Sequence, residues 1–538
     1  MSKKWVYMVL ALVALSAFTH CAKRGMPTGG EKDTIPPVFL RANPGNFTTN
    51  FKAEEIRIHF NEFIKLQDAQ KQVIFSPPLD PKPTLSPLGN PQKYIRIQFN
   101  DTLLQPNTTY TVNFGNSIVD HNEENPLPFF KYVFSTGAQL DSLQISGSVR
   151  NALERETDAF VAVMLYRLDK QYTDSIPYQK PPTYIAYTKD STGQFSLENM
   201  RAGKYKAVAI KDENSNYLYN PYQDKIDFLS DTISLPTDKT LRFSLFKEKP
   251  GFELVKLKQE SARKASIGYV GELPDSLEIN QIYPTYANAK LPYIKSLDTD
   301  TLYYFVPEAL KQDSLVIAYR HQQQVDTLHT RVKELYKDSL QFTPLTKPNI
   351  GLLDSIGVYA NVPKANLDLT KVSLTDQDSA AVAFKSVFKP IKNQWVFGFE
   401  SAPSSKYNLQ LLPGAFTDIY GATNDTLSFN YQTPSLDNLA NLQVNVSIDS
   451  PYPLLVQVLN DRDEVVRSIS QNNAQKAFAF NYLKPGNYYV RLIEDANGNK
   501  QWDTGNYLKK QKPEKVHYLP GKVELRANWE VVEQFNIR

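Results

Sequence analysis

The stretch FSLENMRAGKYKAVAIKD at residues 195–212 has a counterpart in FAFNYLKPGNYYVRLIED at residues 478–495. In both stretches a Phe precedes a Gly by eight positions, and that Gly precedes an Asp by nine. Each Phe is expected on one strand, the Gly supplies a positive φ at the turn, and Gly-x-Tyr opens the next strand. Because identical spacing twice is hard to obtain by chance, we interpret both stretches as parts of one repeated β module.

A second module also occurs twice, as a strand that begins with Tyr, a polar turn around Asp and a closing strand. The Tyr precedes the Asp by ten positions in the first copy, Tyr110 to Asp120, and by eleven in the second, Tyr407 to Asp418. The segments are YTVNF at 110–114, IVD at 118–120 and YVFST at 132–136, then YNLQL at 407–411, FTD at 416–418 and LSFNY at 427–431.

The composition favours β structure throughout the chain of 538 residues, which contains 31 Tyr, 29 Phe and 35 Pro but only 22 Gly. Aromatic residues suit half-buried pleated sheets, and Pro belongs at turns and strand edges. Alternations such as EIRIHF at 55–60 and YIRIQF at 94–99 have the period of two that is typical of strands. At roughly 100–150 residues per domain, the length predicts about four or five domains, and the spacing of strands and turns predicts tandem β-sandwiches.

The first twenty-one residues have the pattern of a lipoprotein signal peptide. Lys3 and Lys4 precede the apolar run WVYMVLALVALSAF at 5–18, which is shorter than a membrane span. The run ends just before Cys21, which is the single cysteine of the chain, so no internal disulfide is expected. This arrangement resembles the lipobox, in which the thiol is diacylated and the signal is cut just before the Cys. An uncleaved anchor and a plain secretory signal are the alternatives.

Several motifs resemble known families. The segments IPPV at 35–38, NP at 43–44 and IHFNE at 58–62 resemble the bacterial Ig-like (SbsA-type) domain, an Ig-like β-sandwich. The tether CAKRGMPTGG, running into DTIPP at 33–37, resembles the Ig-like-domain lipoproteins of Bacteroidota. The Gly-x-Tyr modules are similar to transthyretin-like, carboxypeptidase-regulatory-like sandwiches. These resemblances imply a lipoprotein of the outer membrane and imply little about its molecular task.

The resulting expectation is an all-β chain of tandem β-sandwich domains, Ig-like and transthyretin-like, after a lipoprotein signal peptide. The predicted divisions are a signal peptide at 1–20, a lipidated tether at 21–35, an Ig-like sandwich at 36–137, a transthyretin-like sandwich at 138–250, a β-rich domain of unknown type at 251–340, a second Ig-like sandwich at 341–435 and a second transthyretin-like sandwich at 436–538.

Two polar loops that follow the Gly-x-Tyr strands are candidate calcium sites. Oxygen ligands at positions 1, 3, 5 and 9 of a loop suit a hard cation such as Ca²⁺. Neither loop has Gly at position 6 or Glu at position 12, and the alternative is a polar turn in which Asx side chains cap their own backbone. A bound ion would stiffen the loop, and no cofactor is required. The candidate ligands are Asp212, Asn214, Asn216 and Asn220, and then Asp495, Asn497, Asn499 and Asp503.

Catalytic and nucleic-acid signatures are missing from the sequence. The six His form no HExxH motif, and the chain has no GxSxG elbow, phosphate-binding Gly loop or dinucleotide fingerprint. The net charge of +3 and the even spread of Lys and Arg do not indicate nucleic-acid binding. We therefore expect no enzyme, although folding could still assemble a pair of carboxylates for hydrolysis.

The favoured function is a non-catalytic lipoprotein of the outer membrane that binds a protein partner as a scaffold. The expected partner is a β-barrel transport or assembly complex, since lipidation would hold the chain beside integral membrane proteins. The alternative is a surface lipoprotein that binds glycans through the loop aromatics Tyr217, Tyr219 and Tyr222. The sequence leaves open which face of the outer membrane carries the protein.

Overall fold

The structure is a computed structural model that describes residues 32–99, 104–189, 192–274, 277–285, 292–321, 324–472 and 476–537. The predicted signal peptide, Cys21 and most of the tether lie outside the described residues. Contacts divide the chain into two compact units, residues 1–143 with 198–201 and residues 144–197 with 202–538, and each unit is described by itself. Within the described ranges, no helix is both long and apolar enough to cross a membrane.

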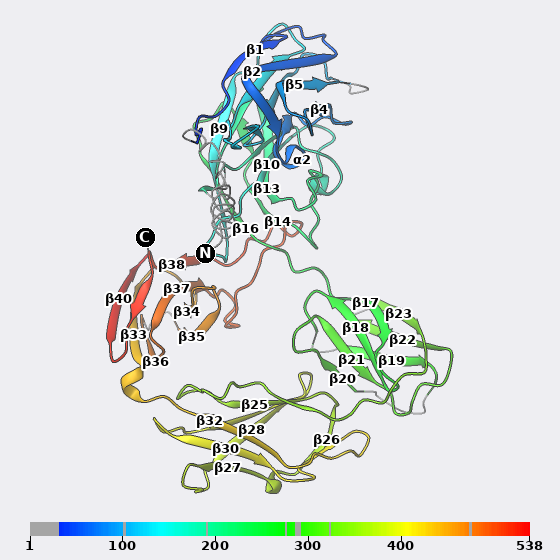
Figure 1. Ribbon diagram of the computed structural model, residues 1–538, viewed down its shortest axis with the longest axis vertical. Helices are drawn as coiled ribbons and strands as arrows, with labels where there is room; N and C mark the ends of the chain where they lie inside the picture. Colours follow the sequence, from blue (N-terminus) through cyan, green and yellow to red (C-terminus); the bar gives the residue numbers. More distant parts are fainter. Residues whose placement is uncertain are drawn as a thin grey trace, which may run out of the picture. The chain divides into compact units, whose positions relative to one another are not determined.

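The chain is all-β, as the sequence predicts, and its strands form tandem β-sandwich domains (Figure 1). In the first domain one sheet has the order β1-β2-β5-β4 with β7 on β2, and the other has the order β3-β6-β8. The elements are β1 Phe39–Asn43, β2 Glu55–Leu66, α2 Ala69–Gln72, β3 Ile74–Ser76, β4 Thr84–Ser86, β5 Gln92–Gln98, β6 Thr109–Asn113, β7 Ile118–Asp120 and β8 Lys131–Ser135.

The core of the first domain follows from the alternation in its longest strand. Strand β2 buries Ile56, Ile58 and Phe60, and it exposes Arg57 between them. The buried side chains pack against the inner faces of β5 and β6, including Ile97 and Tyr110. A period of two in the sequence therefore places one face of the sheet in the core.

The second domain has the sheets β11-β10-β13-β14, with β15 on β13, and β12-β9-β16. Its elements are β9 Leu143–Asn151, β10 Ala162–Arg167, η1 Ile176–Tyr178, β11 Tyr184–Tyr187, β12 Gln194–Met200, β13 Gly203–Lys211, β14 Lys225–Phe228, β15 Ile233–Leu235 and β16 Leu241–Leu245.

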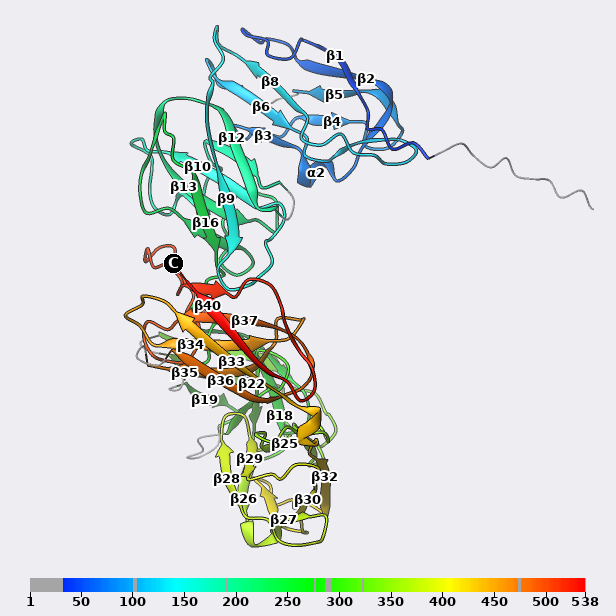
Figure 2. The ribbon, with the colours of Figure 1, turned by 90° about the vertical axis from the view of Figure 1, so that its left-hand side faces the viewer.

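The fifth domain repeats this topology with the sheets β35-β34-β37-β38, with β39 on β37, and β36-β33-β40 (Figure 2). In both domains the first and last strands pair in parallel, β9 with β16 and β33 with β40. The repeat detected in the sequence is thus a repeat of the fold. Its elements are β33 Ala440–Ser447, β34 Leu454–Leu459, β35 Val465–Gln471, β36 Ala477–Leu483, β37 Gly486–Glu494, β38 Val516–Tyr518, β39 Val523–Leu525 and β40 Glu530–Asn536.

The third and fourth domains lie between these two modules in the sequence. The third has the sheets β17-β18-β21-β20 and β19-β22-β23, and the fourth has β24-β25-β29-β28, β27-β30-β32 and the pair β26-β31. Their elements are β17 Glu253–Gln259, β18 Lys264–Val270, β19 Glu278–Tyr283, β20 Tyr293–Lys295, β21 Thr301–Phe305, β22 Ser314–His321, β23 Gln324–Arg331, β24 Phe342–Pro344, β25 Ile356–Ala360, β26 Lys364–Leu367, η3 Leu369–Lys371, β27 Val372–Asp376, β28 Phe384–Lys389, β29 Gln394–Phe399, β30 Lys406–Leu411, β31 Phe416–Asp418, β32 Leu427–Gln432 and η4 Leu436–Asn438.

The first and fourth domains share a tyrosine that fastens a strand to the loop before it. The hydroxyl of Tyr110 accepts a hydrogen bond from the backbone N–H of Gln105 at 2.8 Å. In the fourth domain the hydroxyl of Tyr407 accepts one from the N–H of Ala402 at 2.6 Å. In each case the partner lies five residues upstream, which is the arrangement of the tyrosine corner of Ig-like sandwiches.

Replacing either tyrosine by phenylalanine is expected to lower the stability of its own domain by about 1–2 kcal/mol, because a backbone N–H loses its acceptor. Urea denaturation followed by hydrogen exchange, read separately in each domain, measures the loss for Tyr110→Phe and Tyr407→Phe. The control is Tyr452→Phe, at a tyrosine that is 42% exposed. A loss in this control as large as in the two corner variants would contradict the assignment.

Candidate functional site

The predicted loop of the fifth domain begins at Asp495, directly after β37. The side chain of Asp495 is fully buried and accepts hydrogen bonds from the backbone N–H groups of Gly498 at 2.8 Å, Asn499 at 3.1 Å and Lys500 at 2.8 Å. A carboxylate that accepts several backbone N–H groups holds a turn closed. Asp495 is therefore the organising residue of this loop.

The loop of the second domain has the same backbone conformation. The carboxylate of Asp212 accepts hydrogen bonds from the N–H of Asn214 at 3.1 Å and of Tyr217 at 2.7 Å. The residues three and five positions after each Asp have positive φ in both loops. These residues and their φ values are Ser215 at 54° and Tyr217 at 62°, and Gly498 at 73° and Lys500 at 64°.

A second carboxylate, further along the chain, accepts hydrogen bonds from the backbone of each loop, and its position cannot be predicted from the sequence. In the second domain Asp224 accepts hydrogen bonds from the N–H of Glu213 at 3.1 Å and of Asn220 at 2.7 Å. In the fifth domain Glu514 accepts them from the N–H of Ala496 at 2.6 Å and of Asp503 at 3.0 Å. The N–H donors occupy equivalent positions, one and eight residues after the organising Asp.

Burial raises the pKa of both closing carboxyl groups. Nearby negative charges act in the same direction, from Asp212 on Asp224 and from Asp503 and Asp495 on Glu514. Each loop is therefore an electronegative site built from two or three carboxylates. Sequence reasoning missed Asp224 and Glu514 because they follow the organising Asp at different distances in the two copies.

The predicted ligands of the fifth domain lie together, but their polar atoms also bond to one another. One carboxylate oxygen of Asp503 accepts from the side-chain amides of Asn497 at 2.5 Å and Asn499 at 2.8 Å. The amide oxygens of the same two residues accept backbone N–H groups two residues ahead, from Asn499 and Gln501. These are the hydrogen bonds of Asx turns. Among the described residues, no group of three His, Cys, Asp or Glu is placed to hold a metal ion.

The predicted ligands of the second domain are more dispersed. The amide of Asn214 donates to Gln223 at 2.6 Å, and the side-chain oxygens of Asn216 and Asn220 accept the N–H groups of Leu218 and Tyr222. Calcium binding by either loop stays a prediction.

The aromatic surface predicted in the second domain is wrong for two of its three tyrosines. Tyr217 and Tyr219 are 6% and 3% exposed, whereas Tyr222 is 54% exposed. Burial raises the pKa of Tyr217 to about 12. The turn around Asp212 directs both rings inward, so they cannot stack on a glycan at the surface. The sequence pattern does not predict which tyrosines are buried, because a polar loop has no periodicity that distinguishes aromatic residues facing the core from exposed ones.

Tyr219 belongs instead to a buried polar cluster shared by the second and fifth domains, both of which lie in the second unit. Its hydroxyl donates to the carboxylate of Glu248 at 2.8 Å, and the backbone N–H of Tyr507 donates to the other oxygen of that carboxylate. Glu248 is 6% exposed, and the ring of Tyr507 packs 6.3 Å from that of Tyr219. A buried charge is tolerated here because it accepts two hydrogen bonds.

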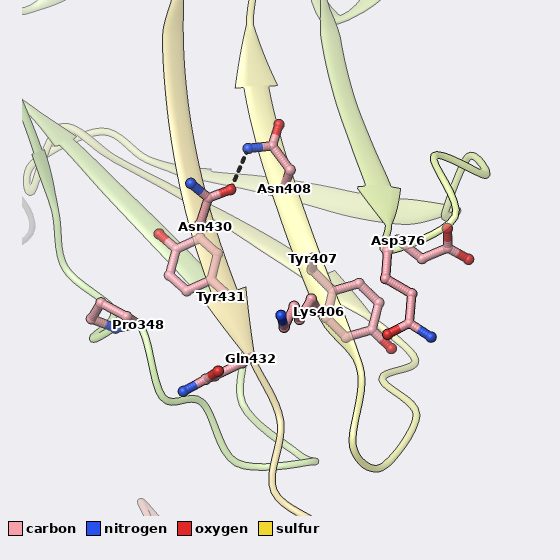
Figure 3. A pocket seen from close by; sticks show the side chains of 9 residues that line it. Pro348, Asp376, Lys406, Tyr407, Asn408, Asn430, Tyr431 and Gln432 are labelled. Atoms are coloured by element: carbon pink, nitrogen blue, oxygen red, sulfur yellow. Dashed lines mark hydrogen bonds between the residues drawn. The ribbon is translucent and has the colours of Figure 1, made fainter.

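A groove of about 420 Å³ lies on the fourth domain (Figure 3). Lys406 and several amide side chains line it, and Asn408 donates to Asn430 at 2.8 Å. Tyr431 also lines the groove but is only 3% exposed, and its buried hydroxyl has no hydrogen-bond partner among the described residues. The remaining lining residues are Pro348, Asp376, Gln377, Tyr407 and Gln432.

Comparison with known proteins supports the fold of the N-terminal part. Residues 33–136 match a family model described as a bacterial Ig-like domain. Among curated proteins, none matches this sequence. The chain is therefore an all-β protein of tandem sandwiches with a bacterial Ig-like domain at 33–136.

Similar solved structures include surface layer protein SbsC, domains 1–6, at 8% identity, with 91% of this chain and 68% of that chain covered and a TM-score of 0.15. The major pilin subunit of Bacillus cereus is 9% identical, with 73% and 99% covered and a TM-score of 0.14. A titin Ig tandem is 14% identical, with 34% and 95% covered and a TM-score of 0.14.

Proposed function

We propose that the protein is a non-catalytic lipoprotein of the outer membrane, of the Bacteroidota type, that acts as a binding scaffold. Its partner is a β-barrel transport or assembly complex. The observation that carries the proposal is the buried contact between the second and fifth domains through Glu248 and Tyr507, because it joins two sandwiches that are distant in the sequence. The polar side chains of the two loops also support a scaffold, because their hydrogen bonds hold the turns in one conformation.

The tether places the first domain close to the membrane surface. Lipidation at Cys21 leaves the predicted tether up to Ile35 as a connection, and its fifteen residues reach at most roughly 50 Å. The start of the first domain exposes Ile35 and Val38 at 64% and 51%, and Phe63 of strand β2 is 53% exposed. The N–H of Val38 donates to the side chain of Asn61 at 2.7 Å, which holds this segment beside β2. Exposed apolar side chains of this kind suit a protein partner.

Purification of the tagged, full-length protein from gently solubilised outer membranes, with mass spectrometry of what stays bound, tests this proposal. We expect a stoichiometric β-barrel partner, and we expect Phe63→Glu combined with Val38→Glu to release it. The matched control is Val387→Glu, at a residue of the fourth domain that is 57% exposed. Recovery of the protein alone in several mild detergents would contradict the scaffold.

Glycan binding is the second candidate, and one observation favours it. The groove of the fourth domain is lined by the amide side chains of Gln377, Asn408 and Asn430. Amides supply both the donors and the acceptors that a neutral sugar needs. If no protein partner is recovered, soluble glycans are to be tested against this groove, in place of the buried Tyr217 and Tyr219.

A further inference from the structure

The two carboxylate-organised loops differ in one respect, which is an insertion in the fifth domain. Both loops match up to the eighth residue after the organising Asp, Asn220 or Asp503, and both are closed by a buried carboxylate, Asp224 or Glu514. Between these points the second domain has only residues 221–223, whereas the fifth has TGNYLKKQKP at 504–513. Because three residues close the loop in one copy, the ten in the other are not needed to complete the fold.

The insertion contacts the second domain along its length. At its start the hydroxyl of Thr504 donates to the backbone carbonyl of Lys247 at 2.7 Å. In its middle the N–H of Tyr507 donates to Glu248. Figure 1 shows the segment between β37 and β38 reaching β14 and β16 of the second domain.

Charged groups fasten the far end of the insertion. Lys512 Nζ lies 2.6 Å from a carboxylate oxygen of Asp227 and also donates to the carbonyl of Phe228. Asp227 is 2% exposed, and Lys512 reaches it beside a groove of about 480 Å³ that residues 229–242 form. A second ion pair joins Lys510 to Asp174 at 2.9 Å.

The insertion packs so closely against the second domain that the size of its side chains is restricted. A Cβ atom on Gly505 would lie 2.7 Å from the ring of Phe246 and 2.7 Å from the carbonyl oxygen of Gln511, so no larger side chain fits. The ring of Tyr507 is 1% exposed and packs against Phe228, with the ring centroids 5.4 Å apart. Such a fit is typical of a specific interface core.

Residues outside the insertion extend the same interface. The hydroxyl of Tyr518 donates to the carbonyl of Leu153 at 2.7 Å, and the side chain of Leu153 packs against Leu455 and Ile493. The guanidinium of Arg155 lies 3.6 Å from the centre of the Tyr489 ring. The interface thus has an apolar centre with polar contacts around it.

We propose that residues 504–513 are a docking arm, and that the surface of the second domain around Phe246, Glu248 and Asp227 is its receptor within the same chain. The contact between arm and receptor, here called the clasp, joins the second domain to the fifth. The third and fourth domains, residues 251–435, connect these two domains in the sequence, so their two ends meet at one interface. The chain's own arm occupies the receptor because its groups pair with the two carboxylates buried there. The N–H of Tyr507 donates to Glu248, and the ammonium of Lys512 pairs with Asp227. This inference concerns the chain alone and does not depend on a membrane partner.

Cleavage of the full-length protein at one engineered position tests the clasp. A recognition sequence for a site-specific protease is inserted in the turn Leu436–Asn438, where Leu436 is 50% exposed, and the cut protein is analysed by size exclusion with mass determination. We expect the two fragments to stay together at the mass of one chain. Replacing residues 504–513 by the three-residue connection PYQ of the second domain is expected to raise their dissociation constant at least about 100-fold. Gly505→Val and the pair Tyr507→Ala with Lys512→Glu are expected to act in the same direction.

The matched control removes an ion pair between the fourth and fifth domains. Arg467 lies 3.1 Å from Asp354, and Arg467→Ser is expected to leave the cut fragments associated. Circular dichroism of the released fragment shows whether the fifth domain of each variant is folded. Three results would overturn the proposal: separation of the unmodified fragments after cleavage, undiminished association without the arm, or association at the mass of two chains, which would place the arm on a second copy.

Discussion

Alanine in place of Asp495 is expected to lower the free energy of unfolding of the fifth domain by about 2–4 kcal/mol. The buried carboxylate accepts three backbone N–H groups, and its removal leaves those of Gly498 and Lys500 without their acceptor, whereas that of Asn499 keeps the side-chain oxygen of Asn497. Hydrogen exchange in urea, read in peptides that cover β37 and the loop after it, measures the loss. The exposed Asp449 provides the control, since Asp449→Ala is expected to change stability by less than about 0.5 kcal/mol. Equal effects of the two substitutions would show that Asp495 does not organise the loop.

The same measurement separates the two interpretations of the loop. If the site of Asp495, Asn497, Asn499 and Asp503 binds Ca²⁺, adding the ion to chelator-treated protein stabilises the fifth domain, by about 2.7 kcal/mol at a hundred times the dissociation constant. Asp495→Ala would abolish that gain. If the residues form only a polar turn, chelator and calcium give the same stability, and the loss in Asp495→Ala comes from the hydrogen bonds alone.

The fold is largely predictable because its signals are local. The alternation in β2 and the spacing from Phe to Gly to Asp depend on residues that are neighbours along one strand or one turn. Gly203 and Gly486 occupy the same position in the two modules, with φ of 158° and 159°. The Tyr of the Ig-like module marks a tyrosine corner for the same reason, since its partner lies only five residues away.

The site is less predictable because its partners are distant in the sequence. The closing carboxylates Asp224 and Glu514 follow different lengths of loop, so a fixed ligand spacing cannot find both. Tyr219 looks like a loop aromatic until Glu248 and Tyr507 are placed beside it by folding. One signal is available in the sequence, since aligning the two copies of the module reveals seven extra residues in the second, ten at 504–513 against three at 221–223.

Glu248→Ala is expected to weaken the docking of the fifth domain on the second by about 3 kcal/mol, which is more than 100-fold in the dissociation constant of the cleaved protein. The substitution leaves the hydroxyl of Tyr219 and the N–H of Tyr507 without their shared acceptor in a buried site. A control at the exposed Glu272, Glu272→Ala, is expected to leave the dissociation constant unchanged within about twofold.

A double-mutant cycle tests whether Glu248 acts through these hydrogen bonds. Tyr219→Phe removes one donor and is expected to cost about 1–2 kcal/mol, whereas Tyr219→Phe in the Glu248→Ala background is expected to cost almost nothing, because the acceptor is already gone. The resulting coupling energy is about 1.5 kcal/mol, within the range of directly contacting groups. Strictly additive losses would mean that the two side chains stabilise the interface independently. A coupling of the expected size would make Glu248 the point at which the loop of the second domain, through Tyr219, and the arm of the fifth, through Tyr507, are joined.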